Sequence, residues 1–213
     1  MDIEVTQTGA TAGAQRVGRR HLLGAGLGGA ALSLLPFLSG RARAEAAPEE
    51  TTTVPKAPTS DDIALLASAQ QLELTVRDLY DSAIAAVAGW SDTQAAVMVA
   101  IREAHEEFAN SLSGLLGREA PGTRSDSLFD GQVGSLAGTP DEALMAAAEL
   151  ESGAVATHAE ILGALQSFNG AELIAAIQMA EARHCTVLAH LADSRDYAVL
   201  LVDEEAASLQ VNG

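Results

Sequence analysis

The chain has little of two things that would each indicate a particular class of protein. It contains one cysteine, Cys185, so no internal disulfide holds the fold together. Basic residues are also few, because 12 Lys and Arg stand against 29 Asp and Glu, which gives a formal net charge of −17. A chain with this charge repels phosphate backbones. The composition therefore excludes nucleic-acid binding as the function.

The chain also lacks an apolar run strong enough to predict a stable membrane span. The best candidate, residues 22–40, contains five glycines, whereas a span needs about 20 mostly apolar residues. Arg19 and Arg20 precede this run, and Ala-Arg-Ala at 42–44 follows it, which is the order of a signal peptide with a cleavage site. The arginine pair resembles a twin-arginine export signal. We therefore expect residues 1–44 to be a twin-arginine-type signal peptide.

Export by this signal would deliver the protein to the periplasm, the cell envelope or the medium, with no stable membrane span after cleavage. An ordinary secretory signal and an uncleaved anchor stay open as alternatives. The remainder of the chain would be more acidic, with seven basic and 27 acidic residues. It divides into a Pro-rich linker at 45–58, one domain at 59–196 and a C-terminal tail at 197–213. Within the tail, we expect the apolar run 198–202 to pack on the domain and the acidic end to be loose.

From residue 59 onward the composition predicts an all-α domain. Ala and Leu are abundant, β-branched residues are few, and strict alternation of apolar and polar residues is rare. Ser91, Thr139 and Asn169 are each followed three residues later by Glu or Gln, and Thr59 is followed by Asp62, which is the pattern of a helix start. The predicted helices cover residues 60–88, 92–117, 140–166 and 170–194.

The four predicted helices form two pairs that repeat each other. The motif L-E-x6-Y at 72–80 corresponds to L-E-x6-H at 150–158, and residues 101–112 align with residues 177–188. Repeats of this kind indicate a duplicated structural unit. Each pair has a short connection, whereas the longer segment 118–139 joins the pairs. We therefore predict an antiparallel four-helix bundle of two duplicated hairpins with a long crossover.

Charged residues interrupt the apolar stripes of these helices. Glu73 lies within the stripe of the first helix, Glu151 is its counterpart in the repeat, and Glu181 lies within the stripe of the last helix. A carboxylate in such a place is costly to bury unless it is paired, protonated or bound to a metal. His184 follows Glu181 by three residues, so both side chains lie on one helix face and can reach one ion. These positions are therefore candidate metal ligands.

At these motifs the sequence resembles the ferritin-like superfamily, specifically the bacterial ferritin-like domain of desiccation-related and exported proteins. The resemblance rests on the two L-E motifs and on A-E-A-R-H at 180–184, and it covers about residues 60–195. It implies a site for two iron or manganese ions, to which two helices give one Glu each and two give a Glu-x-x-His pair each. Carried over by position, the metal ligands are Glu73, Glu151, Glu181 and His184, with His105 as a further candidate.

The second helix departs from the family pattern. His105 stands where the Glu-x-x-His pair should have Glu, and Phe108 stands where it should have His. Phe108 cannot bind a metal, whereas His105 can bind one but brings no negative charge. Three outcomes stay open: two ions, one ion on the intact positions, or no metal, with His105 and His184 as imidazolium partners of buried Glu.

Two functions are compatible with these residues. The first is an exported, ferritin-like metal-binding protein with an iron or manganese redox or stress-related role, and the second is a non-enzymatic structural or interaction module of the cell envelope. The sequence does not decide whether the protein is an enzyme. Divalent metal ions are the expected partners, and a monomer or homodimer fits better than a storage cage. We expect Tyr80 and His158 to be core residues rather than ligands, and Met179 to pack in the core as well. His190 is expected on the surface.

Overall fold

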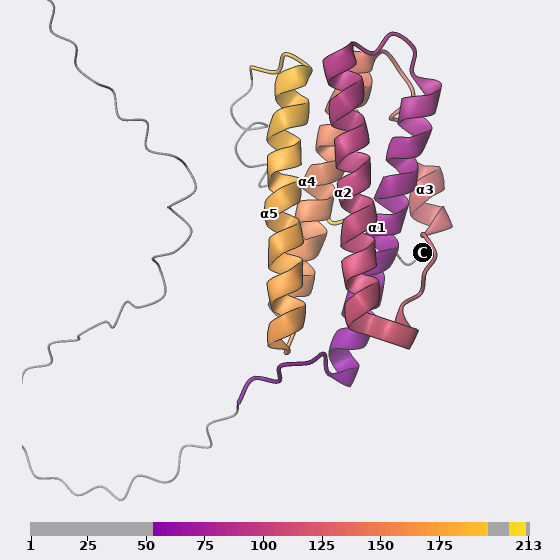
Figure 1. Ribbon diagram of the computed structural model, residues 1–213. Coiled ribbons are helices and arrows are strands. Elements are labelled where there is room, and N and C mark those ends of the chain that lie inside the picture. Colours follow the sequence, from indigo (N-terminus) through magenta and orange to yellow (C-terminus); the bar gives the residue numbers. More distant parts are fainter. Residues whose placement is uncertain (1–52, 196–204, 212–213) are drawn as a thin grey trace, which may run out of the picture. The chain divides into compact units, whose positions relative to one another are not determined.

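The structure, a computed structural model, describes residues 53–195 and 205–211, and within them it is all-α (Figure 1). The expected signal peptide, residues 1–44, lies outside the described residues. Two helical hairpins form the bundle, because α1 packs mainly on α2 and α4 mainly on α5. The helices are α1 (Ser60–Ala86), α2 (Asp92–Leu116), a 3-10 turn η2 (Gly117–Glu119), α3 (Asp126–Gln132), α4 (Pro140–Ala164) and α5 (Phe168–Leu191).

Three of the four predicted helix starts are confirmed by complete capping boxes. The side chains of Thr59, Ser91 and Thr139 each accept a hydrogen bond from the backbone amide three residues on, and the side chain at that third position accepts one from the amide of the capping residue. These reciprocal bonds satisfy amides that have no partner within the helix. The long helices end one to three residues earlier than predicted, which is within the fraying of helix ends.

The predicted start of α5 at Asn169 is wrong, because a distant segment caps this helix. Ser167 is the N-cap residue but makes no side-chain capping bond. Instead, the amides of Phe168 and Asn169 donate to the carbonyl oxygens of Pro55 and Lys56, at 2.8 and 3.1 Å. The described part of the Pro-rich linker thus satisfies the first turn of α5, which a local sequence motif cannot reveal.

The crossover contains a short helix that the sequence did not predict. The first turn of α3 is fixed by Ser125, whose side chain accepts from the amide of Leu128 and whose own amide donates to Thr75 of α1 at 2.9 Å. Leu128 is buried against the bundle core. α3 lies beside α1 (Figure 1), so the crossover is attached to the first hairpin.

The described end of the chain, residues 205–211, lies against the bundle, so the expectation of a loose end is wrong there. The amide of Leu209 donates to Thr157 of α4 at 2.8 Å, and Ser125 donates to the carbonyl oxygen of Val211 at 2.5 Å. Gly153 makes room for this segment, since a Cβ there would lie 2.9 Å from the Leu209 side chain. The apolar run 198–202 lies outside the described residues.

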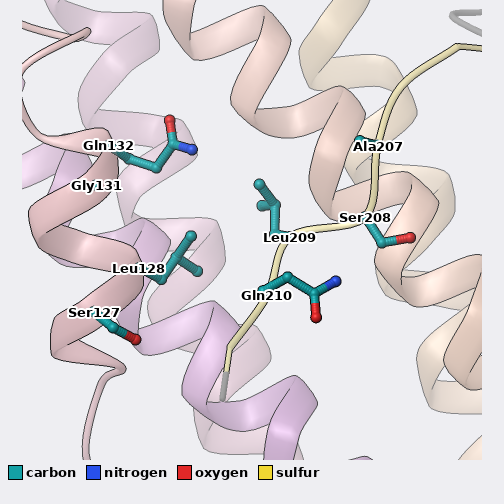
Figure 2. Close-up of a pocket in the computed structure, with 8 residues that line it drawn as sticks. All are labelled: Ser127, Leu128, Gly131, Gln132, Ala207, Ser208, Leu209 and Gln210. Carbon is teal, nitrogen blue, oxygen red and sulfur yellow. The ribbon is translucent and has the colours of Figure 1, made fainter. Parts of the chain in front are cut away.

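A depression of about 520 Å³ separates this segment from α3 (Figure 2). Its lining contains no acidic residue and no histidine: Ser127, Leu128, Gly131, Gln132, Ala207, Ser208, Leu209 and Gln210. Such a lining offers no carboxylate or imidazole to a metal ion. The charged centre of the protein lies elsewhere, inside the bundle.

The interior of the bundle is apolar at both ends and carries charged groups between them. One apolar cluster includes Leu79, Met98 and Leu144, and the other includes Leu66, Leu112 and Ile174. Met179 is 60% exposed, so its predicted place in the core is wrong, whereas His190 is on the surface as predicted. No helix among the described residues is long and apolar enough to cross a membrane.

Candidate metal centre

Six ionisable side chains from all four long helices meet inside the bundle. Five of them are 0% exposed, and the side chain of His184 is 17% exposed. Their spacing along each helix, three residues on α5 and seven on α4, keeps them on the inner face. They are Glu73 of α1, His105 of α2, Glu151 and His158 of α4, and Glu181 and His184 of α5.

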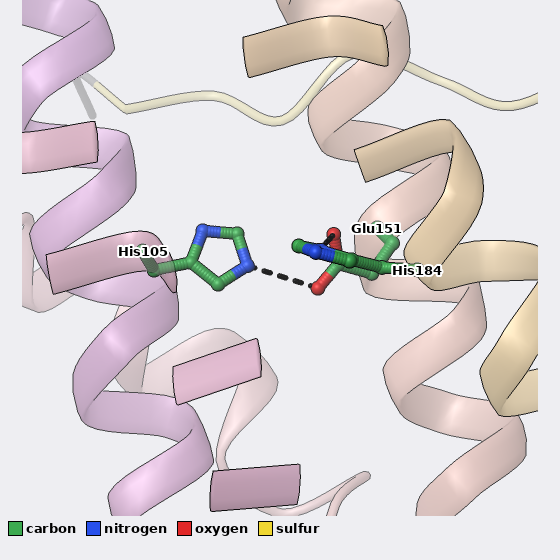
Figure 3. Close-up of side chains that lie close together, drawn as sticks. All are labelled: His105, Glu151 and His184. Carbon is green, nitrogen blue, oxygen red and sulfur yellow. Dashed lines mark hydrogen bonds and ion pairs between the residues drawn. The ribbon is translucent and has the colours of Figure 1, made fainter. Parts of the chain in front are cut away.

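His105 connects two carboxylates across the bundle. Its Nδ1 lies 2.7 Å from Oε2 of Glu73, and its Nε2 lies 2.9 Å from Oε1 of Glu151. Oε2 of Glu151 is 3.2 Å from Nδ1 of His184. Figure 3 shows His105 pointing from α2 towards Glu151, with His184 of α5 beside the same carboxylate. One carboxylate is therefore held between two imidazoles.

His158 of α4 likewise lies between two carboxylates, those of Glu181 and Glu73. Its Nδ1 lies 2.8 Å from Oε2 of Glu181. Its Nε2 lies 3.3 Å from Oε1 of Glu73, but the two atoms are not aligned for a hydrogen bond. Glu73 thus stands between His105 and His158, and the buried groups alternate between carboxylate and imidazole.

Two aromatic side chains complete the surroundings of Glu151 and His184. The hydroxyl of Tyr80 donates to Oε1 of Glu151 at 2.6 Å, and its ring stacks on His105 at a centroid distance of 5.7 Å. Phe108, which replaces a histidine of the family pattern, is half-buried and stacks on His184 at 6.4 Å. The Phe108 ring therefore covers the partly exposed side of the centre.

The buried carboxylates have opposite electrostatic surroundings. Burial would raise the pKa of Glu151, but the charge of His105 and hydrogen bonds from His105 and His184 lower that pKa to about 2. Burial raises the pKa of Glu181 to about 7, because the charge of His158 offsets only part of the cost and Glu73 repels a second negative charge. The pKa of Glu151 is thus lowered and that of Glu181 is raised, although both carboxyl groups are fully buried.

The pKa values of the two bridging imidazoles are raised by the buried carboxylates around them. Burial disfavours a charged imidazole, but the charge of Glu151 and bonds to Glu151 and Glu73 raise the pKa of His105 well above 6.5. For His158, burial is likewise outweighed, chiefly by the charge of Glu181, and its pKa is raised. Protonated imidazoles thus compensate the buried carboxylates, which explains how the bundle can bury them without an ion.

The donor atoms are close enough together to hold a divalent ion. Two groups of three have ligand atoms within 4.8 Å of one another: His105 with Glu151 and His184, and Glu73 with His105 and Glu181. One oxygen of Glu73 and one of Glu181 have no hydrogen-bond partner although they are buried. Unpaired buried oxygens are costly, and carboxylates with imidazoles suit iron, manganese and zinc. The residues present therefore fit a metal ion.

All five residues predicted as metal ligands come together in this centre: Glu73, His105, Glu151, Glu181 and His184. The predicted core residues Tyr80 and His158 are indeed buried, but their polar atoms contact the same carboxylates. Their signal in the sequence was the common distance of seven residues from Glu73 and Glu151. That distance places them on the inner face, although it does not show what they contact.

The comparison with models of known protein families gives a match. The family model described as ferritin-like domain matches residues 61–194, which is most of the described bundle. No curated protein and no solved structure matches the chain. The match agrees with the helical bundle and with the groups of buried Glu and His that could hold a metal. The chain belongs to the ferritin-like domain family.

Proposed function

We propose that the protein binds iron or manganese in the buried centre and has a redox or stress-related role outside the cytoplasm. The observation that carries the proposal is the convergence of three fully buried carboxylates, two of which have an oxygen without a hydrogen-bond partner. Apolar side chains would serve a purely structural core better than these groups do. A divalent ion would give the unpaired oxygens a partner and would balance their charge.

In this proposal each residue has a distinct task. The three glutamates supply negative charge, and His105 and His184 supply nitrogen ligands at Glu151. Tyr80 holds the orientation of Glu151 through its 2.6 Å hydrogen bond. A bound iron or manganese ion would supply electron-transfer chemistry. Burial of the ligands and the Phe108 ring over His184 would limit access of water to that ion.

Elemental analysis of the protein, purified without chelators after natural export, tests this function. We expect at least one iron or manganese ion per chain, and we expect Glu151→Gln to lose it. Glu149→Gln, which changes an exposed carboxylate on the same helix, is the matched control and should keep the ion. Absence of metal, together with no uptake from added Fe(II) or Mn(II), would contradict the proposal.

The second candidate is a metal-free structural or interaction module of the cell envelope. It is favoured by His105, which contacts Glu73 with one nitrogen and Glu151 with the other and so stands where a cation would be expected. In this alternative His184→Phe would raise the thermal stability of the protein in the absence of metal. In the metal-binding proposal the same substitution would abolish the gain in stability that added metal gives.

The place of action is also part of the proposal and rests on sequence alone. Arg19 and Arg20, the apolar run 22–40 and the Ala-Arg-Ala at 42–44 support export by a twin-arginine-type signal. This route suits a protein that receives its metal while folding in the cytoplasm. Replacing both arginines with lysine should keep the protein in the cytoplasm, as measured by cell fractionation.

A further inference from the structure

Solvent comes nearest to the buried centre at one place on the side of the bundle. Of the six ionisable side chains in the centre, five are 0% exposed, and only that of His184, at 17%, reaches the surface. Routes along the bundle axis are closed, because an apolar cluster fills each end. A hydrated ion cannot cross such a cluster without losing the water that stabilises its charge. The shortest way from solvent to the centre therefore passes His184.

The Phe108 ring lies against His184 at this place. Phe108 of α2 stacks on the imidazole of His184 of α5 at a centroid distance of 6.4 Å and an interplanar angle of 18°. It also meets the imidazole of His105 edge-on at 5.7 Å. These are the two imidazoles that flank Glu151 (Figure 3). Since Phe108 is half-buried, its ring stands between them and the solvent.

We propose that ions enter and leave the centre between α2 and α5, that Phe108 is the gate of this entrance, and that His184 is the first ligand on the way in. This inference deepens the proposed function and rests on it, because it names the residue that controls access to the same site. The Phe108 ring must move away from His184 before an ion can reach Glu151. Nδ1 of His184 lies 3.2 Å from Oε2 of Glu151, so the two ligands follow each other directly.

The surroundings of Phe108 allow its ring to act as a gate. A half-buried side chain can change its rotamer without unfolding of the helix that carries it. One turn earlier on the same helix faces stand Ala104 and Ala180, whose methyl groups cannot replace a missing phenyl ring. Phe108 also offers no ligand atom, so its removal leaves all six ionisable groups in place. Its substitution should therefore change the rates of ion entry and exit more than the affinity.

Stopped-flow absorption with Co(II), a coloured divalent ion that accepts carboxylate and imidazole ligands, tests the gate. We expect Phe108→Ala to speed both uptake by the metal-free protein and release to a chelator by roughly 2- to 10-fold, the rate factor that loss of one aromatic pair gives. The bulkier Phe108→Trp should slow both steps. Phe129→Ala, which removes another half-buried ring from α3, is the matched control and should leave both rates unchanged.

The possible outcomes separate this inference from the proposed function. Unchanged uptake and release rates in a Phe108→Ala protein that binds Co(II) would overturn the gate alone. Faster release without faster uptake would also contradict it, because Phe108 would then only stabilise the bound state. Failure of the unchanged protein to bind Co(II) would overturn the proposed function as well. Circular dichroism checks the helices, and Phe108→Leu, which also shortens the side chain, replaces Phe108→Ala if that variant does not fold.

Hydrogen–deuterium exchange at Cε1 of the histidine rings, measured by mass spectrometry on the metal-free protein, gives a second readout that needs no bound ion. We expect faster exchange at His105 in Phe108→Ala than in the unchanged protein, because water then reaches this ring through the open entrance. The exposed His190 serves as the internal reference and should exchange equally in both proteins. Equal exchange at His105 in the two proteins would contradict an entrance at Phe108.

Discussion

The imidazole of His105 contacts Glu73 through one ring nitrogen and Glu151 through the other, at 2.7 and 2.9 Å. Both carboxylates are fully buried, so neither can exchange this partner for water. His105 occupies the helix position at which the family pattern has a carboxylate, and it brings a positive charge where that pattern brings a negative one. The metal-free centre is therefore balanced by protons, and a bound ion would compete with them.

Removing the His105 imidazole should destabilise the metal-free protein strongly. His105→Leu leaves two buried carboxylates without this partner, and breaking a buried pair costs about 3–5 kcal/mol. His105→Gln keeps a hydrogen-bond donor and should cost less. Urea denaturation in the presence of a chelator measures both, with the exposed His190→Leu as the control. A loss in His105→Leu no larger than in the control would show that the bridge contributes nothing.

The candidate ligands could be predicted from the sequence only at positions that the internal repeat or a family motif marks. Glu73 and Glu151 are recognisable because each follows Leu at the same place in its hairpin, and Glu181 with His184 because they share a helix face. The contact of His158 with Glu181 could not be recognised, since a histidine in an apolar core and one that pairs with a carboxylate have the same spacing. That contact, 2.8 Å between Nδ1 of His158 and Oε2 of Glu181, is a property of the packed bundle.

Among the helices, α2 is the element that differs most from the family pattern. Its ligand positions carry His105 and Phe108 in place of Glu and His, although α1, α4 and α5 keep their glutamates. Since Phe108 packs on both His105 and His184, the change is accommodated by aromatic contacts. In the proposed centre, α2 would thus limit the number of ions that can bind.

Restoring the ligand pair on α2 should increase the number of bound ions. The double variant His105→Glu with Phe108→His returns a carboxylate and an imidazole that share one helix face. We expect it to bind one more ion per chain than the unchanged protein and to be less stable than it when metal-free, because four carboxylates would then be buried together. Elemental analysis gives the stoichiometry. An unchanged stoichiometry in a folded variant would contradict a limiting role of α2.

The helix starts were predictable where the cap is local and not where it is distant. Thr59, Ser91 and Thr139 carry their capping partner three residues away, so sequence spacing is sufficient. The start of α5 depends on the carbonyl groups of Pro55 and Lys56, more than 100 residues earlier. α3 was missed because a seven-residue helix is too short for a periodic pattern.

The Asp62 carboxylate connects the start of α1 to the segment between α4 and α5. We call this set of hydrogen bonds the joint, and we expect acid to weaken it. Its carboxylate accepts bonds from the amides of Thr59, Gln166 and Ser167. Burial opposes ionisation, but these bonds prevail and lower the pKa from 3.8 to about 2. A lowered pKa in the folded state means that the stabilisation is present above the unfolded value of 3.8 and is lost as the pH falls towards 2.

We therefore expect Asp62→Asn to be less stable than the unchanged protein at neutral pH, and the difference to shrink as the pH falls below about 4. Asp61→Asn, one residue away and exposed, is the matched control and should show no such convergence. Urea unfolding at a series of pH values gives the free energies. A difference that is independent of pH would mean that the charge of Asp62 does not stabilise the joint.

The protein as a whole is strongly acidic, yet its buried centre carries three imidazoles beside three carboxylates. Exposed carboxylates bind divalent ions weakly and without preference, so cation binding alone does not identify the centre. Binding at the centre differs because Glu151 and Glu73 outweigh the effect of burial and raise the pKa of the His105 ring nitrogens well above the usual 6.5. An ion that takes these nitrogens must displace protons, whereas an ion on the surface need not.

Metal affinity should accordingly rise as the pH is raised above 6.5, the usual pKa of histidine, and binding should release protons. Isothermal titration with Mn(II) in two buffers of different ionisation enthalpy measures the number released. High salt should remove weak surface binding, because screening acts on exposed charges, and should leave the buried site. Binding without proton release would mean that the ion does not reach the imidazoles.

Anomalous diffraction from crystals of the protein soaked in Fe(II) or Mn(II), recorded at the absorption edge of the metal, would locate a bound ion directly. The predicted result is a peak inside the bundle, among Glu73, Glu151 and Glu181, with an imidazole nitrogen as a neighbour. Peaks confined to exposed carboxylates, with density for the bridging imidazoles undisturbed, would contradict metal binding at the centre. The bundle would then be a ferritin-like fold whose buried charges are balanced by protonated histidines alone.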